Sequence, residues 1–414
     1  MKDQTETAFD VPVYWSSAPL RKLCSFHNGL WTGKKEPYET AHVIRNTNFT
    51  ADGRIDLSDV AVLEVEARHL AKRRLQKNDI IIEKSGGGPK QPVGRVVLFD
   101  IDDGIYSFSN FTSAIRVEDR NALDPVYLHR VLYYWYISGR TEPLQRRSTG
   151  IRNLNFDAYK DLVVPLPPLE EQKRIVAVLD QAFAALDRAR ANAEANLADA
   201  GNMFACFLEL KLDENSGVWP AYPMKNLGRI QTGGTPKASD KDSYGDYIPF
   251  IKPGDFNPDG TLETNNAGLS ETGAQRARIV PSGSALMVCI GATIGKAGFS
   301  EVDVACNQQI NSITPKPGVS GEFLYYQFLS PSFQKEVWRR SGQATLPIIN
   351  KSKWSEIAVR VPESEEAQTH IIESLREMRR HTEMLMAGYA EKLKSIADLR
   401  QSLLQQAFSG RLTA

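Results

Sequence analysis

The residues in this sequence whose types and spacing best suit chemistry are cations and amides that lie close to glycine. Arginine offers a fork of donors that fits the O6 and N7 atoms of guanine, and the side-chain amides of asparagine and glutamine fit adenine. Lysine can meet a phosphate, and glycine lets the backbone approach a ligand closely. These segments therefore suit contact with nucleic acid. The candidate residues are Lys84, Ser85, Gly87, Lys90, Gln91, Arg146, Arg147, Arg152, Asn153, Thr235, Lys237, Lys296, Gln308, Arg339, Arg340 and Gln343.

Each candidate segment also has a plainer interpretation. A glycine-rich loop is usually a turn, and a pair of surface charges is usually solvated. The candidates therefore indicate nucleic-acid contact as a set, and no single one of them is specific.

Catalytic constellations are the next class to consider. Residues 291–296 resemble a phosphate-binding loop, but one residue is missing between the glycines, and Ala297 stands where a serine or threonine must hold magnesium. Residues 257–260 begin like an amino-methyltransferase signature but lack its second proline and its aromatic residue, so we expect a turn there. The 6 histidines and 4 cysteines show no metal-ligand spacing. We expect no catalytic residue, no metal site and no cofactor in this chain, and a self-contained nuclease or methyltransferase is disfavoured.

Composition limits the classes of protein further. Lysine plus arginine number 50 and aspartate plus glutamate number 50, so a charge spread over the whole surface cannot attract nucleic acid or an anionic membrane. Cysteines far apart favour a reducing compartment. No apolar run approaches the ~20 residues of a membrane helix, and the first ten residues are polar and acidic. We expect a cytoplasmic protein without membrane contact.

An internal repeat organises the chain. Short motifs recur in the same order at a distance of roughly 200 positions, as loop insertions in two copies of one fold would produce. Ile44-Arg45 recurs as Ile251-Lys252, and Val93-Gly94-Arg95 recurs as Ile294-Gly295-Lys296. Arg146-Arg147-Ser148 is matched with Arg339-Arg340-Ser341 in the same way. The series predicts two related halves with a pseudo-two-fold relation.

Each half combines a globular part with a long helix. Residues 75–84, 95–100 and 285–290 predict buried strands, and residues 127–137 and 322–329 predict short helices. The fold class is therefore α/β, with mixed α+β character. We expect globular domains at 1–165 and 214–362, and helical spacers at 166–213 and 363–414.

The two helical segments carry apolar residues at spacings of three and four, which is typical of a coiled-coil seam. Each spans about 40 residues, or ~60 Å. A row of apolar side chains of that length must be buried against other residues. The helices could pair antiparallel and hold the globular domains apart, they could pair with other subunits, or each could pack on its own domain. The residues expected to bind a partner are Ile175, Leu179, Leu186, Leu375, Leu385, Leu393, Leu403 and Phe408.

Four segments carry a resemblance to a known family. They are Pro-Leu-Pro-Pro-Leu-Glu-Glu-Gln at 165–172, Ser-Leu-Leu-Gln-Gln-Ala-Phe-Ser-Gly-Arg-Leu at 402–412, Thr-Gly-Gly-Thr-Pro at 232–236 and Gly-Ile-Arg-Asn-Leu at 150–154. With them, essentially the whole chain resembles the specificity subunit of type I restriction-modification systems. The second helical linker departs from some relatives, because Glu363-Ser364-Glu365-Glu366 replaces the Pro-Leu-Glu-Glu form.

The resemblance implies a non-catalytic subunit. Each globular domain would be a target recognition domain that reads one half of an asymmetric, bipartite sequence in double-stranded DNA. The helices would set the unread spacer and dock two modification subunits that use S-adenosylmethionine, and restriction subunits would use ATP and magnesium. The alternative is a coiled-coil interaction scaffold without DNA readout, which filter binding in the presence of the modification subunit would distinguish.

Overall fold

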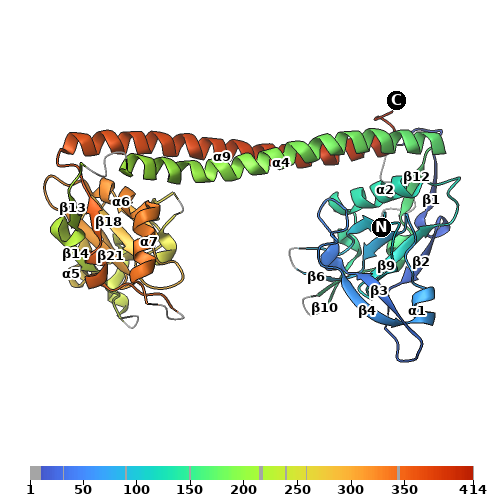
Figure 1. The fold of residues 1–414 in the computed structure, drawn as a ribbon, viewed down its shortest axis with the longest axis horizontal. Coiled ribbons are helices and arrows are strands. Elements are labelled where there is room, and N and C mark those ends of the chain that lie inside the picture. The colour runs from blue at the N-terminus through green and yellow to red at the C-terminus, as the bar shows by residue number, and fades with distance from the viewer. Residues whose placement is uncertain are drawn as a thin grey trace. The chain divides into compact units, whose positions relative to one another are not determined.

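The chain folds into two units (Figure 1). Unit 1 comprises Met1–Asn192 and Lys392–Ala414, and unit 2 comprises Ala193–Glu391. Each of the two long helices therefore contributes one stretch to each unit, and the helices form no unit of their own. The computed structural model describes residues 11–30, 32–88, 91–148, 151–213, 218–237, 240–257, 259–342 and 346–413.

The core of unit 1 is a four-stranded antiparallel sheet in the order β2-β9-β5-β7. Three consecutive isoleucines make β5 a strand that is buried on both faces, as β-branched residues favour. Helix α2 covers this sheet, and the side chain of Asp124 caps it by accepting from the amides of Val126 and Tyr127. The bounds are β2 Cys24–Asn28, β9 Thr112–Val117, β5 Ile80–Glu83, β7 Val96–Leu98 and α2 Pro125–Ile137.

Three smaller sheets complete unit 1. The order β4-β3-β8 forms the first, with β3 and β8 parallel; β1 pairs with β12; and β10-β11-β6 forms the third. The bounds are β1 Ser16–Pro19, η1 Leu20–Lys22, β3 Tyr38–Ile44, η2 Asn46–Asn48, β4 Ala61–Glu66, α1 Ala67–Ala71, β6 Ser85–Gly87, β8 Tyr106–Phe108, η3 Glu142–Leu144, β10 Gln145–Ser148, β11 Ile151–Leu154, α3 Phe156–Lys160 and β12 Val163–Leu166.

Unit 2 repeats the main sheet and the β1-β12 pair, and it repeats the order β4-β3-β8 with one strand, β17, added. Its main sheet has the order β14-β21-β18-β19 under helix α6, its second sheet has the order β16-β15-β20-β17, and β13 pairs with β22. The bounds are β13 Ala221–Pro223, η4 Met224–Asn226, β14 Gly228–Thr232, η5 Lys241–Ser243, β15 Tyr244–Ile251, η6 Pro253–Asp255, β16 Gly268–Leu269, α5 Glu271–Arg276, β17 Ile279–Val280, β18 Ser284–Val288, β19 Ala297–Ser300, β20 Val304–Cys306, β21 Ile310–Pro315, α6 Gly321–Leu329, α7 Pro331–Arg340, α8 Lys351–Ser355 and β22 Ala358–Arg360.

The repeat extends to single hydrogen bonds. The amide of Gly94 donates to the backbone carbonyl of Glu83, and at the same place in unit 2 the amide of Gly295 donates to the backbone carbonyl of Val288. Both glycines have φ near or above 90°, a backbone conformation that suits glycine alone. The internal repeat and the α/β class expected from the sequence are confirmed.

One predicted correspondence between the halves is wrong. Arg146 and Arg147 lie on strand β10, whereas Arg339 and Arg340 end helix α7. The two arginine pairs occupy the same stretch of the topology, between α2 and α3 or between α6 and α8, but they belong to different kinds of element. Similar short basic motifs concealed this difference in the sequence.

The long helices are α4, Leu169–Asp213, and α9, Glu365–Phe408. In unit 1 they pack antiparallel, because Asp187 near the middle of α4 pairs with Arg400, whereas Glu171 at its start accepts from Thr413. In unit 2 the guanidinium of Arg379 on α9 lies 4.6 Å from the ring centroid of Phe204 on α4. Antiparallel pairing was one of the arrangements that the sequence left open.

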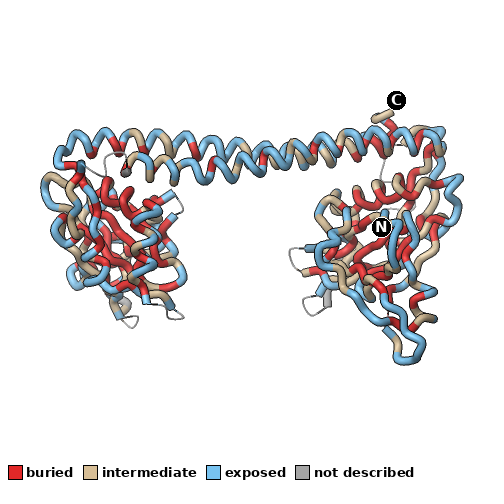
Figure 2. The backbone as a smooth tube through the Cα atoms, viewed as in Figure 1, coloured by how far each residue is buried: buried red, intermediate tan, exposed pale blue. Residues whose placement is uncertain are grey.

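The predicted partner-binding seam requires a correction. Ile175, Leu179, Leu186 and Phe408 are buried in the core of unit 1, and Leu375 is buried in the core of unit 2. These side chains cover the chain's own sheets and helices and offer no surface to a partner. Leu385 is 43% exposed, and Leu393 and Leu403 are half-buried. Figure 2 shows that exposed residues predominate along the middle stretches of both helices.

A fully buried glutamine fixes the first turn of each long helix. The amide nitrogen of Gln172 donates to the carbonyls of Ala122 and Pro167, and its oxygen accepts from the amide of Asp124. Gln368 repeats these contacts in unit 2, where its nitrogen donates to Gly318 and Pro362 and its oxygen accepts from Ser320. Each glutamine therefore ties the start of a long helix to the loop that leads into α2 or α6.

We expect Gln172→Glu to lower the free energy of unfolding of unit 1 by about 3 kcal/mol, because a carboxylate oxygen would face two carbonyl oxygens in the interior. Denaturant unfolding followed by hydrogen exchange and mass spectrometry would assign the loss to a unit. Gln368→Glu should destabilise unit 2 instead. Gln181→Glu, on the exposed surface of α4, is the control. Equal stability of the Gln172 and Gln181 variants would contradict the role of the buried amide.

Candidate nucleic-acid interface

Three loops meet at one end of the main sheet in each unit. In unit 1, β2 ends at Asn28, β5 ends at Glu83 and β9 begins at Thr112. Because β2 and β5 both pair antiparallel with β9, Asn28 lies opposite Ser113 and Glu83 lies opposite Thr112. The three loops therefore leave the sheet side by side.

Unit 2 places the equivalent loops at the equivalent end. Thr232, the last residue of β14, lies opposite Asn311, and Val288, the last residue of β18, lies opposite Ile310. The predicted segments at 232–237 and 307–309 are thereby brought together. Their contact includes a hydrogen bond from the hydroxyl of Thr235 to the side chain of Gln308.

Glycine makes the close contact between two of these loops possible. A Cβ atom on Gly233 would lie 2.2 Å from the carbonyl oxygens of Cys306 and Asn307. In unit 1, a Cβ atom on Gly29 would lie 1.9 Å from the carbonyl oxygen of Ser109. Sequence inspection found the segment with Gly233 but missed Gly29, because a lone glycine in a polar stretch carries no recognisable signal.

Unit 1 extends its loop end with the sheet β10-β11-β6, whose strands β6 and β10 Figure 1 labels at one edge of the unit. Arg146 lies opposite Asn153, and Arg152 lies opposite both Arg147 and Gly87. The hydroxyl of Ser85 donates to Oδ1 of Asn153 over 2.6 Å. This sheet gathers six of the predicted residues, namely Ser85, Gly87, Arg146, Arg147, Arg152 and Asn153.

Unit 2 builds the corresponding stretch differently. The amide of Gly291 donates to the carbonyl of Pro347, and Leu346 and Ile348 on that segment are exposed. Helix α7 joins the same surface, because the amide nitrogen of Gln334 donates to the carbonyl of Gly295 over 2.7 Å. Apolar and helical features thus replace the arginine-bearing sheet of unit 1.

The arginines at the end of α7 are partly neutralised. Arg339 and Arg340 both donate to the carboxylate of Glu336, one helical turn earlier. These hydrogen bonds lower the pKa of Glu336 to about 2, and the bond from Arg339 has the largest effect. Arg339 remains exposed to solvent, so it keeps donors that can reach a ligand.

The remaining predicted residues have mixed placements. Nζ of Lys296 donates to the carbonyl of Phe256, as Arg95 donates to the carbonyl of Phe49 in unit 1. Each cation therefore links the residue before β7 or β19 to the turn after η2 or η6. Lys84 is half-buried beside Asn28, the backbone of Gln91 pairs with Gly88, and Lys237 is exposed. Lys90 and Gln343 lie outside the described residues, and Arg147 is described in its backbone alone.

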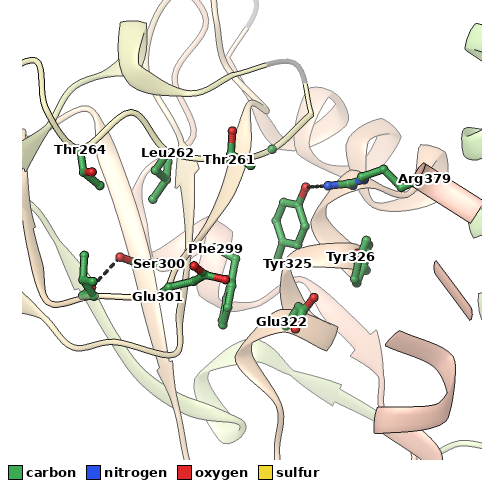
Figure 3. A pocket seen from close by; sticks show the side chains of 12 residues that line it. Thr261, Leu262, Thr264, Phe299, Ser300, Glu301, Glu322, Tyr325, Tyr326 and Arg379 are labelled. Carbon is green, nitrogen blue, oxygen red and sulfur yellow. Dashed lines mark hydrogen bonds between the residues drawn. The ribbon is translucent and has the colours of Figure 1, made fainter. Parts of the chain in front are cut away.

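A cavity of about 300 Å³ in unit 2 lies where helix α9 meets the domain (Figure 3). The guanidinium of Arg379 points at Tyr325 and donates to its hydroxyl over 2.6 Å. Burial raises the pKa of Tyr325 to about 12, although Arg379 acts in the opposite direction. Tyr325 in turn donates to the carbonyl of Asp259 over 3.1 Å. A neutral phenol held between a cation and a carbonyl is suited to fixing the helix on the domain.

No group of three or more histidine, cysteine, aspartate or glutamate side chains within the described ranges is arranged to hold a metal ion. Among the helices that the structure describes, none combines the length and the apolar character that crossing a membrane requires.

Comparisons with known proteins agree with the repeat. The family described as the type I restriction modification DNA specificity domain matches residues 12–196 and 218–395. The HindI specificity subunit of Haemophilus influenzae is 34% identical over 195 residues, a match that covers 44% of this chain and 41% of that subunit. A putative MjaX specificity subunit of Methanocaldococcus jannaschii is 21% identical, and the match covers 86% of this chain and 85% of that protein.

Two solved structures share the fold. A chain from a study of complex assembly and conformational transition of the type I R-M system superposes with a TM-score of 0.77, at 19% identity, over 98% of this chain and 100% of that one. The HsdS subunit of Thermoanaerobacter tengcongensis superposes with a TM-score of 0.61, at 20% identity, over 99% and 100% of the two chains.

We expect Gly233→Ala to separate the loop after β14 from the loop before β21, because the added methyl group would collide with two backbone carbonyls that cannot move independently. Hydrogen exchange of the amides at 233, 234 and 310 should become faster. Gly234→Ala is a matched control, since nothing lies within 4 Å of the Cβ position there. Similar exchange in both variants would show that the loop contact does not depend on the glycine.

Proposed function

Because the chain belongs to the type I restriction modification DNA specificity domain family, we propose that it is the DNA-recognition subunit of a type I restriction-modification complex. The observation that carries the proposal is the pair of equivalent loop ends, one per unit, where the same scaffold presents different side chains. Two copies of one scaffold whose loops carry different side chains are suited to reading two different DNA sequences.

Each unit would read one half of an asymmetric target in double-stranded DNA. Unit 1 offers arginine, asparagine and lysine on and beside a small sheet, of which Arg152 and Asn153 are adjacent members. Such side chains pair with base edges in the major groove. Unit 2 offers Thr235, Gln308 and the exposed Arg339 of α7 instead. Two different sets of donors and acceptors cannot favour the same half-site.

The helices would set the distance between the half-sites. Helix α4 is one uninterrupted helix of 45 residues that takes part in both units. At 1.5 Å per residue it is roughly 68 Å long. One turn of B-DNA measures ~34 Å. A continuous helix of this length is therefore long enough to separate two groove-reading units by at least a turn of DNA.

Catalysis would reside in other subunits. The exposed stretches of α4 and α9, with apolar residues such as Met203, Leu385 and Leu399, provide surface on which two modification subunits can dock. Those subunits would bring S-adenosylmethionine, and restriction subunits would bring ATP and magnesium. We assign no cofactor to this chain and place the complex in the cytoplasm, where the DNA is.

We expect Arg152→Ala, in a complex with the modification subunits, to weaken recognition of one half-site by about 1–3 kcal/mol and to leave the other half-site unchanged. Sequencing of methylated adenines across a library of targets would measure both half-sites at once. Arg120→Ala is the control, because Arg120 follows the opposite end of β9 and its guanidinium donates to the carbonyl of Lys77. Equal loss at both half-sites would contradict the assignment of one half-site per unit. Complexes without sequence preference would favour the interaction scaffold.

A second prediction concerns the spacer. Inserting four residues, about one helical turn or ~6 Å, after Ala193 in α4 and after Glu391 in α9 should lengthen the preferred spacer and keep both half-sequences. The insertions lie where each helix passes from one unit to the other, so both cores remain intact. Methylation mapping would reveal the outcome. New half-sequences with the original spacer would refute the role of the helices as a ruler.

A further inference from the structure

Two lysines of unit 1 share one aromatic ring. Nζ of Lys84 lies 5.6 Å from the ring centroid of Phe156, and Nζ of Lys160 lies 4.8 Å from the same centroid. Lys160 also lies 5.2 Å from the centroid of Phe26, which packs edge-on against Phe156. An aromatic face attracts a cation, and two cations beside one ring repel each other.

The ammonium group of Lys84 has a neutral hydrogen-bond partner. It donates to Oδ1 of Asn28 over 3.0 Å, and no ion pair of the described residues includes it. Burial lowers the pKa of Lys84, and the positive charge of Lys160 lowers it further. The ammonium group is therefore half-buried without an anion, an arrangement that costs solvation energy.

Lys160 has a weak anionic partner. Its ammonium lies 3.2 Å from the carboxylate of Asp157, three residues earlier on α3. The Asp157 side chain is 87% exposed, so water screens this pair and it contributes little. The carboxylate of Asp157 therefore leaves much of the positive charge beside Phe156 uncompensated.

Three other cations of unit 1 are paired more fully. Arg95 forms an ion pair with the buried carboxylate of Glu83, and Arg116 does so with Asp79. Lys77, an exposed lysine, pairs with Asp102 over 2.6 Å. Compared with these three cations, the two lysines beside Phe156 form a cluster with an excess of positive charge among the residues that the structure describes.

This cluster adjoins the loop end described above. Lys84 links β5 to β6, and its carbonyl accepts from the amide of Leu154 at the end of β11. Helix α3, which carries Phe156 and Lys160, follows β11 directly. The two ammonium groups thus lie beside the sheet that carries Arg152 and Asn153.

We propose that Lys84 and Lys160 together bind one phosphate of the DNA backbone, which sets the register of unit 1 on its half-site. The inference rests on the proposed function and adds to it a contact that carries no base specificity. A phosphodiester has two free oxygens and one negative charge, so one phosphate can accept a hydrogen bond from each ammonium and relieve their repulsion.

The equivalent positions of unit 2, which the structure describes, carry no such pair. The position equivalent to Lys84 is Cys289, since the amide of Ile349 donates to Cys289 as the amide of Leu154 donates to Lys84. Cys289 is buried and uncharged, because burial raises the pKa of its thiol to about 12. Ser355, which follows the buried Trp354, takes the place of Lys160. The phosphate contact is therefore confined to the half-site read by unit 1.

The test uses the full complex with its modification subunits and a duplex that contains the methylated target. Lys84→Met and Lys160→Met keep the apolar stems beside Phe156 and remove one charge each. Affinity is measured over a range of salt concentrations, and each variant should lower the slope of log K against log salt by about one. The double variant should lower it by no more than either single variant, because the lysines share one phosphate. Lys77→Met, which removes a paired lysine of the same unit, should leave the slope unchanged.

Ethylation interference locates the contact. The wild-type complex should be blocked by ethylation of one phosphate in the half-site of unit 1, and this block should disappear in both lysine variants. An unchanged slope in Lys84→Met, or additive losses in the double variant, would overturn the shared phosphate. If the wild-type complex shows no preference for its target over a scrambled duplex, the proposed function itself fails. Specific wild-type binding with no effect of either lysine would refute this inference alone.

Discussion

The geometry of each unit depends on the buried side-chain amide at the start of its long helix. Gln172 and Gln368 each satisfy one carbonyl just before their own helix, and one carbonyl and one amide of a loop that would otherwise have buried, unpaired backbone groups. Those loops lead into α2 and α6, which pack on the main sheets. One hydrogen-bonded side chain therefore connects the direction of a helix to the position of a sheet, and so to the loops at the end of that sheet.

The two units share their core sheets and differ in the segments around the loop end, because core packing constrains the sequence of the sheets more than that of these segments. Sheet order is repeated between the units because the strands of the main sheets contribute apolar side chains to the core, all of them with buried residues except β14, whose Ile230 is half-buried. The stretch between α2 and α3, and its counterpart between α6 and α8, carries fewer buried residues. It can be a hairpin in one unit and a helix in the other, although α7 adds Phe333 and Val337 to the core of unit 2. Chemical diversity is thereby concentrated where a ligand can reach it.

The parts of the structure that could be predicted from sequence were those governed by local patterns. Apolar residues at spacings of three and four, preceded by prolines, indicated both long helices. Runs of β-branched residues indicated the core strands. The match between Arg146 and Arg339 failed because a basic dipeptide carries no information about the element that holds it. The burial of Phe408 and the need for glycine at 29 arise from contacts with residues far away in the sequence. Lys160 was missed because only the fold brings it to the ring that Lys84 also contacts.

Each unit also fixes its domain on the helix pair through an arginine of α9 and a turn that contains Asp-Gly. In unit 1, Arg400 pairs with Asp187, which also pairs with Arg54 beside the turn. In unit 2, Arg379 reaches the carbonyl of Asp259 directly. A phenol contacts the turn in both units, because Tyr133 of unit 1 donates to the carbonyl of Ala51 and Tyr325 of unit 2 donates to the carbonyl of Asp259. The attachments differ in the carboxylate of Asp187, which joins the two arginines in unit 1. A recognition domain transferred between related proteins would keep its orientation only if its turn and the facing positions of the helices moved together, because unit 1 attaches its turn through the carboxylate of Asp187 and unit 2 through a direct contact of Arg379.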